Sequence, residues 1–134
     1  MNMNILVVDD EKDVQILFEQ RFRKEIRDGS THFAFAYSGE EALQYLNQHD
    51  HEAVLILSDI NMPGISGLEL LRRIKSKYKS PPPVVMMITA YGDAENYQQA
   101  MKLGADDFLT KPLDFTALKE KLKTKVNGKD ISSR

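Results

Sequence analysis

Five polar side chains could carry chemistry, because each follows a short apolar segment of the chain within two residues. Two carboxylates, Asp9 and Asp10, come after the first such segment, and a third, Asp59, comes after another. A hydroxyl, Thr89, and an ammonium, Lys111, follow two further segments. Open parallel sheets bind ligands beyond the carboxyl ends of their strands. If the segments are parallel strands, all five groups meet at one edge of the sheet.

Three carboxylates at one edge would repel one another, and the repulsion would raise the pKa of at least one of them unless a cation compensates. Mg²⁺ takes oxygen ligands and usually uses one or two carboxylates together with a phosphate. Lys111 would add a second positive charge, so an anion between metal and ammonium would be neutralised on two sides. The arrangement predicts a phosphoryl site. The chain has no cysteine and no histidine close to these residues, so a carboxylate is the remaining nucleophile, giving an aspartyl phosphate.

Each of these residues also has a structural explanation when it is taken singly. Asp9 and Asp10 could cap the helix that follows them, and Asp59 could belong to a turn. Thr89 suits the end of a strand, and Lys111 could be a solvated loop residue. Together these explanations need four coincidences at one edge, which favours the functional interpretation.

Short apolar segments predict the strands that would position these groups. Apart from residues 32–36, the segments are nearly continuous apolar runs, as expected of parallel strands that are covered on both faces. The predicted strands are 4–8, 32–36, 53–57, 84–88 and 107–109.

Apolar residues at helical spacing fill the intervals between the strands. The predicted helices are 12–26, 39–48, 67–78, 94–103 and 115–126. In the first of them the apolar stripe comprises Val14, Leu17, Phe18, Phe22 and Ile26. Ser38 and Ser66 each stand three residues before a glutamate, the spacing of a capping box, and Asp93 and Asp114 can cap the helices that follow them. Gly128 is read as a stop signal after the last helix.

The βα unit therefore occurs five times, which predicts an α/β fold with helices on both faces of a parallel sheet. A closed eight-unit barrel needs about 250 residues, so an open, doubly wound, flavodoxin-like five-stranded sheet with the strand order 2-1-3-4-5 is favoured. The prediction places one domain at 1–126. Residues 127–134 are predicted to be a flexible tail or the start of a linker.

The composition restricts the classes of function. A chain of 134 residues with 42% hydrophobic and 28% charged residues is typical of one globular domain. Its formal net charge of −2 gives no reason to expect direct binding to nucleic acid. No apolar run reaches the ~18–20 residues of a membrane span, and the N-terminus is unlike a signal peptide. The predicted location is the cytoplasm, without membrane contact.

Four motifs in order give the chain a specific signature, although each motif alone is weak. They are Asp9-Asp10, Asp59-Ile60-Asn61-Met62-Pro63 with Gly67, Thr89-Ala90, and Lys111-Pro112. Over residues 4 to about 126, this pattern resembles the receiver domain of two-component response regulators, the CheY-like superfamily.

The resemblance implies a role for each acidic residue. Asp59 would be the phosphoacceptor. Asp9 and Asp10 would hold Mg²⁺, or Mn²⁺ in its place, together with the Asp59 carboxylate and the backbone carbonyl of Asn61. The Asn61 side chain also stands at a position that influences how fast water attacks the acyl phosphate in this family.

The resemblance also implies roles for the remaining site residues. Thr89 would hydrogen-bond the phosphoryl oxygens, and Lys111 would pair with the acceptor and later with the phosphate. The peptide bond between Lys111 and Pro112 would be cis. Phe108 would be the aromatic switch whose ring swings inward when Thr89 moves. Tyr91, like Asn61, would modulate hydrolysis, and a bulky ring there could hinder the attacking water.

The function that follows is a phosphorylation-dependent switch of a two-component phosphorelay. A sensor histidine kinase, a phosphotransfer protein or a small acyl phosphate would supply the phosphoryl group. The face formed by 94–103, 107–109 and 115–126, near Tyr97 and Lys119, would bind an effector or a second copy. No turnover of an external substrate is expected, so the protein is not predicted to be an enzyme.

Three alternatives are weighed against this function. A receiver-like interaction module that works without phosphorylation usually lacks one of the site residues, and all are present here. A phosphatase using an aspartyl phosphate commonly has Asp-x-Asp after the first strand, whereas Asp9 and Asp10 are adjacent. A flavin carrier of the same fold class would need a phosphate loop where this chain has acids.

Overall fold

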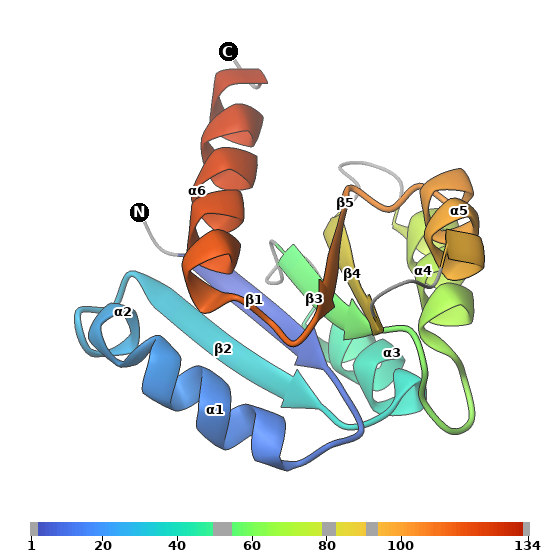
Figure 1. Ribbon diagram of the computed structural model, residues 1–134, viewed down its shortest axis with the longest axis horizontal. Helices are drawn as coiled ribbons and strands as arrows, with labels where there is room; N and C mark the ends of the chain where they lie inside the picture. The colour runs from blue at the N-terminus through green and yellow to red at the C-terminus, as the bar shows by residue number, and fades with distance from the viewer. Residues whose placement is uncertain (1–2, 50–54, 79–82, 91–93, 133–134) are drawn as a thin grey trace.

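The computed structural model describes residues 3–49, 55–78, 83–90 and 94–132, with side chains as far as residue 124. It contains a parallel sheet of five strands in the order β2-β1-β3-β4-β5, as predicted (Figure 1). The strands are β1 (Met3–Val8), β2 (Thr31–Ala36), β3 (Leu55–Asp59), β4 (Val84–Ala90) and β5 (Asp107–Lys111). The first two residues of the predicted strand 53–57 lie outside the described residues.

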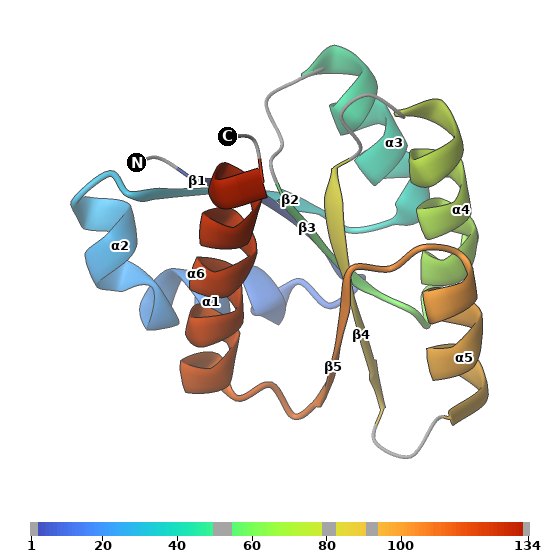
Figure 2. The ribbon, with the colours of Figure 1, turned by 90° about the horizontal axis from the view of Figure 1, so that it is seen from above.

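Helices cover both faces of the sheet, which gives three layers. The helices are α1 (Asp13–Arg21), α2 (Arg23–Arg27), α3 (Gly39–Gln48), α4 (Gly67–Lys77), α5 (Ala94–Lys102) and α6 (Phe115–Ser132). α1, α2 and α6 lie on one face, and α3, α4 and α5 lie on the other (Figure 2). This is the doubly wound α/β arrangement that the sequence predicts. Among the helices described, none is long and apolar enough to cross a bilayer.

Alternate residues of β1 enter different hydrophobic cores. Ile5 and Val7 pack with Phe18 of α1 on one face of the sheet, whereas Leu6 and Val8 pack into the core under α3 and α4. All four strand residues are at most 1% exposed. Since successive side chains of a strand point to opposite faces, a strand buried on both sides needs a continuous apolar run, which is the pattern in the sequence.

Three of the four predicted N-cap side chains cap their helices, although Glu41 accepts the N–H of Tyr37 instead of returning a capping-box bond to Ser38. Ser38 and Ser66 each accept, through Oγ, the backbone N–H of the glutamate three residues later, at 3.0 and 3.2 Å. Asp114 Oδ1 accepts the N–H groups two and three residues further on, at 3.0 and 3.1 Å. Asp93 lies outside the described residues. The caps satisfy first-turn N–H groups and so fix where α3, α4 and α6 begin.

The first helical stretch differs from its prediction, because one expected helix is broken at Phe22. This residue has φ −108° and ψ 24°, and it separates α1 from α2. Its ring packs against Phe33 of β2 and Phe115 of α6, with ring centroids 5.0 and 6.1 Å apart, and tertiary packing of this kind overrides local helix propensity. The apolar stripe is also narrower than predicted, since Leu17 and Ile26 are exposed.

Four elements extend further along the chain than predicted. β3 continues through Asp59, β4 through Ala90 and β5 through Lys111, so Asp59, Thr89 and Lys111 lie within the ends of these strands. α6 runs to Ser132, beyond the predicted stop at Gly128. A glycine inside a helix lowers its stability without having to end it. The division of the chain at residue 126 into a domain and a tail stays a prediction.

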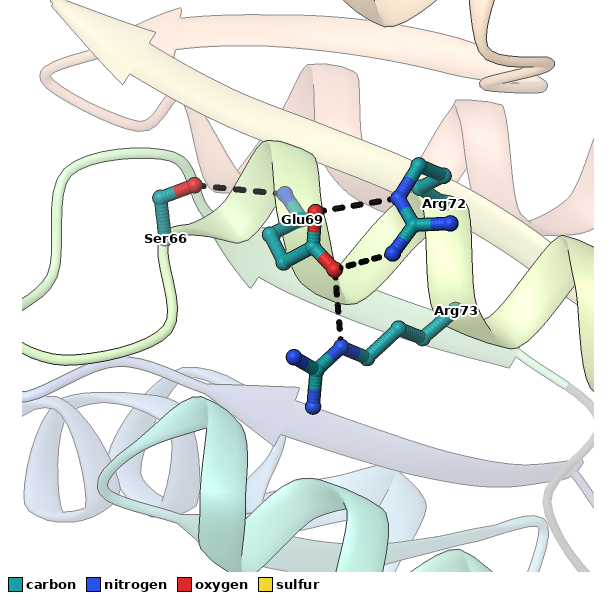
Figure 3. Close-up of polar contacts among 4 residues, drawn as sticks. All are labelled: Ser66, Glu69, Arg72 and Arg73. Carbon is teal, nitrogen blue, oxygen red and sulfur yellow. Dashed lines mark hydrogen bonds and ion pairs between the residues drawn. The ribbon is translucent and has the colours of Figure 1, made fainter.

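The first turn of α4 carries an exposed ion network centred on Glu69 (Figure 3). The Glu69 carboxylate accepts hydrogen bonds from Arg72 Nε at 3.0 Å and from Arg73 Nε at 2.8 Å. These bonds, that of Arg72 first, lower the pKa of Glu69 to about 2. The groups are solvated, so the network orients side chains around the Ser66 cap and contributes little to the stability of the fold.

Candidate functional site

Four adjacent strands deliver the predicted site residues to one edge of the sheet. Asp59 and Lys111 are the last residues of β3 and β5, and Thr89 is the next to last residue of β4. Asp9 directly follows β1, where its backbone N–H donates to the Ala36 carbonyl at 3.0 Å. Because β1, β3, β4 and β5 are neighbours in this parallel sheet, their carboxyl ends meet at the same edge.

The three carboxylates that are predicted to bind a metal lie together. One oxygen from each of Asp9, Asp10 and Asp59 lies within 4.8 Å of the others. Asp9 and Asp59 are buried, with 6% and 4% of their surfaces exposed, whereas Asp10 is exposed. A donor set of carboxylate oxygens suits Mg²⁺ or Mn²⁺, and its exposed side allows water or a phosphate oxygen to complete the coordination.

Lys111 enters the same site from β5. Its Nζ donates to Asp59 Oδ2 at 2.9 Å and lies 3.9 Å from Asp9 Oδ2. Burial opposes the charge of Lys111, but the hydrogen bond to Asp59 and the charges of Asp59, Asp9 and Glu11 outweigh burial and raise the pKa of Lys111. The Lys111–Pro112 bond is cis, as the resemblance implies. The site therefore holds a charged ammonium against the carboxylate of Asp59.

Thr89 supplies a buried hydroxyl to the same edge. The residue is 1% exposed, and its Oγ1 has no hydrogen-bond partner among the described residues. A hydroxyl buried without a partner costs free energy, so this unused bonding capacity is a place where a ligand oxygen can bind. The orphaned hydroxyl fits the predicted contact with a phosphoryl oxygen.

The other predicted site residues are placed less completely. Asn61 is exposed, and its backbone N–H lies 3.4 Å from Asp59 Oδ1. Phe108 is half-buried in β5 and packs edge to face on Tyr97 of α5, with ring centroids 4.8 Å apart. Tyr91 lies outside the described residues. The roles of Asn61 and Tyr91 in hydrolysis, and that of Phe108 as a switch, stay predictions.

Sequence reasoning assigned no role to two further residues, Glu11 after the acidic pair and Tyr37 after β2. Glu11 donates its backbone N–H to Asp9 Oδ1 at 2.9 Å, and its charge contributes to the raised pKa of Lys111. Tyr37, which directly follows β2, donates its hydroxyl to Gln15 Oε1 of α1. Glu11 could have been given a role, because it continues the acidic pair. No sequence pattern connects Tyr37 with Gln15, since only the fold brings them together.

Comparison with known proteins identifies the chain. The family model described as the response regulator receiver domain matches residues 5–123. The chain belongs to this family. It is a receiver domain of two-component signalling, as the resemblance implies.

Solved structures agree with this identification. The receiver domain is similar to a response regulator receiver domain from Clostridium thermocellum, with 27% identity, a TM-score of 0.84 and coverage of 96% of this chain and 98% of that chain. It is similar to the response regulator TrrA of Thermotoga maritima in complex with Mg²⁺ and BeF, with 34% identity, a TM-score of 0.74 and coverage of 91% and 97%. The Ssk1 receiver domain of Saccharomyces cerevisiae, solved with the histidine phosphotransfer protein Ypd1, has 25% identity, a TM-score of 0.77 and coverage of 90% and 86%.

The buried, ionised carboxylate of Asp9 is expected to lower the free energy of unfolding of the receiver domain by a measurable amount. Burial raises the pKa of Asp9 and the Asp59 charge adds to this, against the lowering effects of the Glu11 N–H and of Lys111. A folded-state pKa above the unfolded value means that the ionised carboxyl disfavours folding. We therefore expect Asp9→Asn to raise the free energy of unfolding of the metal-free protein at pH 7 by on the order of 1 kcal/mol, the usual size of a single-site effect.

Urea unfolding in the presence of a chelator measures this effect. The stabilisation by Asp9→Asn should be full above the raised folded-state pKa and should shrink as the pH falls through it, because native Asp9 then takes up a proton. Asp10→Asn is the control, since it removes a carboxylate of the same cluster whose side chain is exposed. A loss of stability for Asp9→Asn at neutral pH would contradict the prediction.

Proposed function

We propose that this receiver domain is a phosphoacceptor switch that takes a phosphoryl group on Asp59 with the help of Mg²⁺. The observation that carries the proposal is the 2.9 Å contact of Lys111 Nζ with Asp59 Oδ2 inside a cluster of carboxylates. Burying charged groups costs free energy. Hydrophobic residues in place of a buried ion pair often make a protein equally stable, so stability alone does not explain such a pair. A buried acid with both an ammonium and further acids beside it suits a site that receives a metal and an anionic group.

Four residues would hold the metal in this proposal. They are Asp9, Asp10 and Asp59, through their carboxylates, and Asn61, through its backbone carbonyl. When bound, Mg²⁺ supplies positive charge that offsets the repulsion between the phosphoryl oxygens and the carboxylates. The complex of TrrA with Mg²⁺ and BeF supports this part of the proposal, because that receiver is 34% identical to the present chain.

In the proposed transfer, Asp59 would be the nucleophile and Lys111 would pair with the reacting groups. An oxygen of the Asp59 carboxylate attacks the phosphorus of a phosphohistidine, and the new O–P bond forms while the N–P bond breaks. The electron pair leaves on the imidazole nitrogen of the donor, which takes a proton from water. Lys111 holds the carboxylate before the transfer and pairs with the phosphoryl oxygens afterwards. A small acyl phosphate serves equally, with its own P–O bond breaking.

Hydrolysis would then reset the switch. Water attacks the phosphorus, the bond to Asp59 breaks, and inorganic phosphate leaves the restored carboxylate. The receiver domain thus promotes its own phosphorylation and dephosphorylation and turns over no external substrate.

Thr89 and Phe108 would transmit the change to the surface. The Thr89 hydroxyl, which is buried without a partner among the described residues, turns to a phosphoryl oxygen and gives the Phe108 ring room to move inward. The ring packs on Tyr97, so its movement alters the face made by α5, β5 and α6. We propose this face as the binding surface for an effector or a second copy of the chain.

The proposed phosphodonor protein is a sensor histidine kinase or a histidine phosphotransfer protein. The similar Ssk1 receiver domain was solved in complex with Ypd1, a histidine phosphotransfer protein, and this complex supports the proposal. The likeness therefore supports a histidine-containing phosphodonor as the class of partner for this chain.

Intact-mass spectrometry tests the proposed function. Incubation with acetyl phosphate and Mg²⁺ is expected to add the mass of one phosphoryl group, and hydroxylamine should remove it, as it does for acyl phosphates. Chelation of the metal before the donor is added should suppress the addition strongly. An unchanged mass with both reagents present would contradict the proposal and favour an interaction module that works without phosphorylation.

A further inference from the structure

Tyr37 directly follows Ala36, whose carbonyl accepts the backbone N–H of Asp9, and it is outside the set of groups that would touch metal or phosphate. The residue is half-buried and directly follows β2. Its hydroxyl donates to Gln15 Oε1, on α1. Its backbone N–H donates to Glu41 Oε1 at 3.1 Å, in the first turn of α3. One residue therefore connects the end of β2 to the N-terminal parts of two helices.

These contacts bracket the acidic loop, residues 9–12, from both sides. At the start of the loop, the Asp9 N–H donates to the carbonyl of Ala36, the residue before Tyr37. Beyond its end, the Tyr37 hydroxyl holds Gln15, whose backbone N–H donates back into the loop at 3.3 Å. The short segment from Ala36 to Tyr37 thus anchors the chain on each side of the acidic residues.

The anchored loop carries two of the proposed metal ligands. Asp9 is buried and accepts the Glu11 N–H, whereas Asp10 is exposed and lies in the loop between the two anchored points. Hydrogen bonds behind the ligands of a metal often decide its affinity, because they orient those ligands. We propose that Tyr37 is a positioning residue of the Mg²⁺ site and acts through Gln15 on Asp10.

This inference rests on the proposed function, and a magnesium titration separates the two. Tyr37→Phe removes one hydroxyl and keeps the ring. We expect its Mg²⁺ affinity, measured by calorimetry with MgCl₂, to fall by about 3- to 10-fold, which corresponds to the net free energy of one hydrogen bond. Gln15→Met removes the acceptor and should give a similar loss. The double variant should lose no more than either single variant, because both changes break the same bond.

A matched tyrosine elsewhere provides the control. The Tyr78 hydroxyl donates to Asn47 Oδ1 at 3.1 Å, near the C-terminal ends of α3 and α4. Tyr78→Phe should therefore leave the Mg²⁺ affinity unchanged. Thermal unfolding of every variant in a chelator reports whether it is folded, and Gln15→Met decides the question should Tyr37→Phe not fold.

The outcomes are distinct. A lower thermal midpoint for Tyr37→Phe and Gln15→Met with the wild-type Mg²⁺ affinity would assign the contact a structural role only. That result overturns the inference and leaves the proposed function intact. Failure of the wild-type receiver domain to bind Mg²⁺ at all would overturn both.

Discussion

Asp59→Asn is expected to abolish phosphorylation of the receiver domain. Asparagine keeps the size of the side chain and an oxygen that can accept the hydrogen bond of Lys111, so the strand end should hold its shape. Its amide is a far weaker nucleophile than a carboxylate and forms no stable phosphoryl adduct. After incubation with acetyl phosphate and Mg²⁺, the intact mass should remain that of the unmodified chain.

Asp114→Asn is the matched control for this substitution. Asp114 Oδ1 caps α6 at 3.0 and 3.1 Å, and asparagine caps helices as well as aspartate does. The control should gain one phosphoryl group like the wild type. A phosphoryl group on Asp59→Asn would move the acceptor to another residue, such as Asp9 or Asp10, and would contradict the assignment.

The layout of the fold could be predicted from the sequence because strands that are buried on both faces have a recognisable local sequence pattern. In β3, residues Leu55, Ile56 and Leu57 are each at most 1% exposed, and a strand segment buried on both faces is typically a continuous apolar run. Capping residues likewise act within three positions of themselves, so Ser38 and Ser66 give the helix starts directly. Both signals involve neighbours in sequence, which a pattern can record.

That Asp9, Asp10, Asp59, Thr89 and Lys111 lie at one edge of the sheet could also be predicted, because each stands within two residues of the end of a strand. The contacts among them could not be. The distance between Lys111 and Asp59 depends on how separate strands pack, and so does the lack of a partner for Thr89 Oγ1 in the part of the chain that the structure describes. The break at Phe22 and the Tyr37 bond to Gln15 have the same origin, since each depends on residues that are distant in sequence.

Gly67→Ala is expected to destabilise the receiver domain strongly and to disturb the acceptor. A Cβ at position 67 would lie 2.1 Å from the backbone oxygen of Asp59 and 2.6 Å from Ile60 Cα. Backbone atoms cannot rotate away as a side chain can, so α4 or the end of β3 must shift. We expect the free energy of unfolding to fall by about 3 kcal/mol, at the upper end of the usual cost of overpacking.

The sign of this effect separates it from helix propensity. Gly67 is the first residue of α4, and alanine is a better helix former than glycine by roughly 0.5–1 kcal/mol, so local preference alone predicts stabilisation. Urea unfolding measures the difference, and the mass addition from acetyl phosphate reports on the acceptor. Gly29→Ala is the control, because its Cβ would meet nothing within 4 Å and only its φ of +80° opposes the change. Since Gly67 packs on the residue that would carry the phosphoryl group, a Gly67→Ala protein that was as stable and as readily phosphorylated as the wild type would show that α4 does not hold the end of β3 in place.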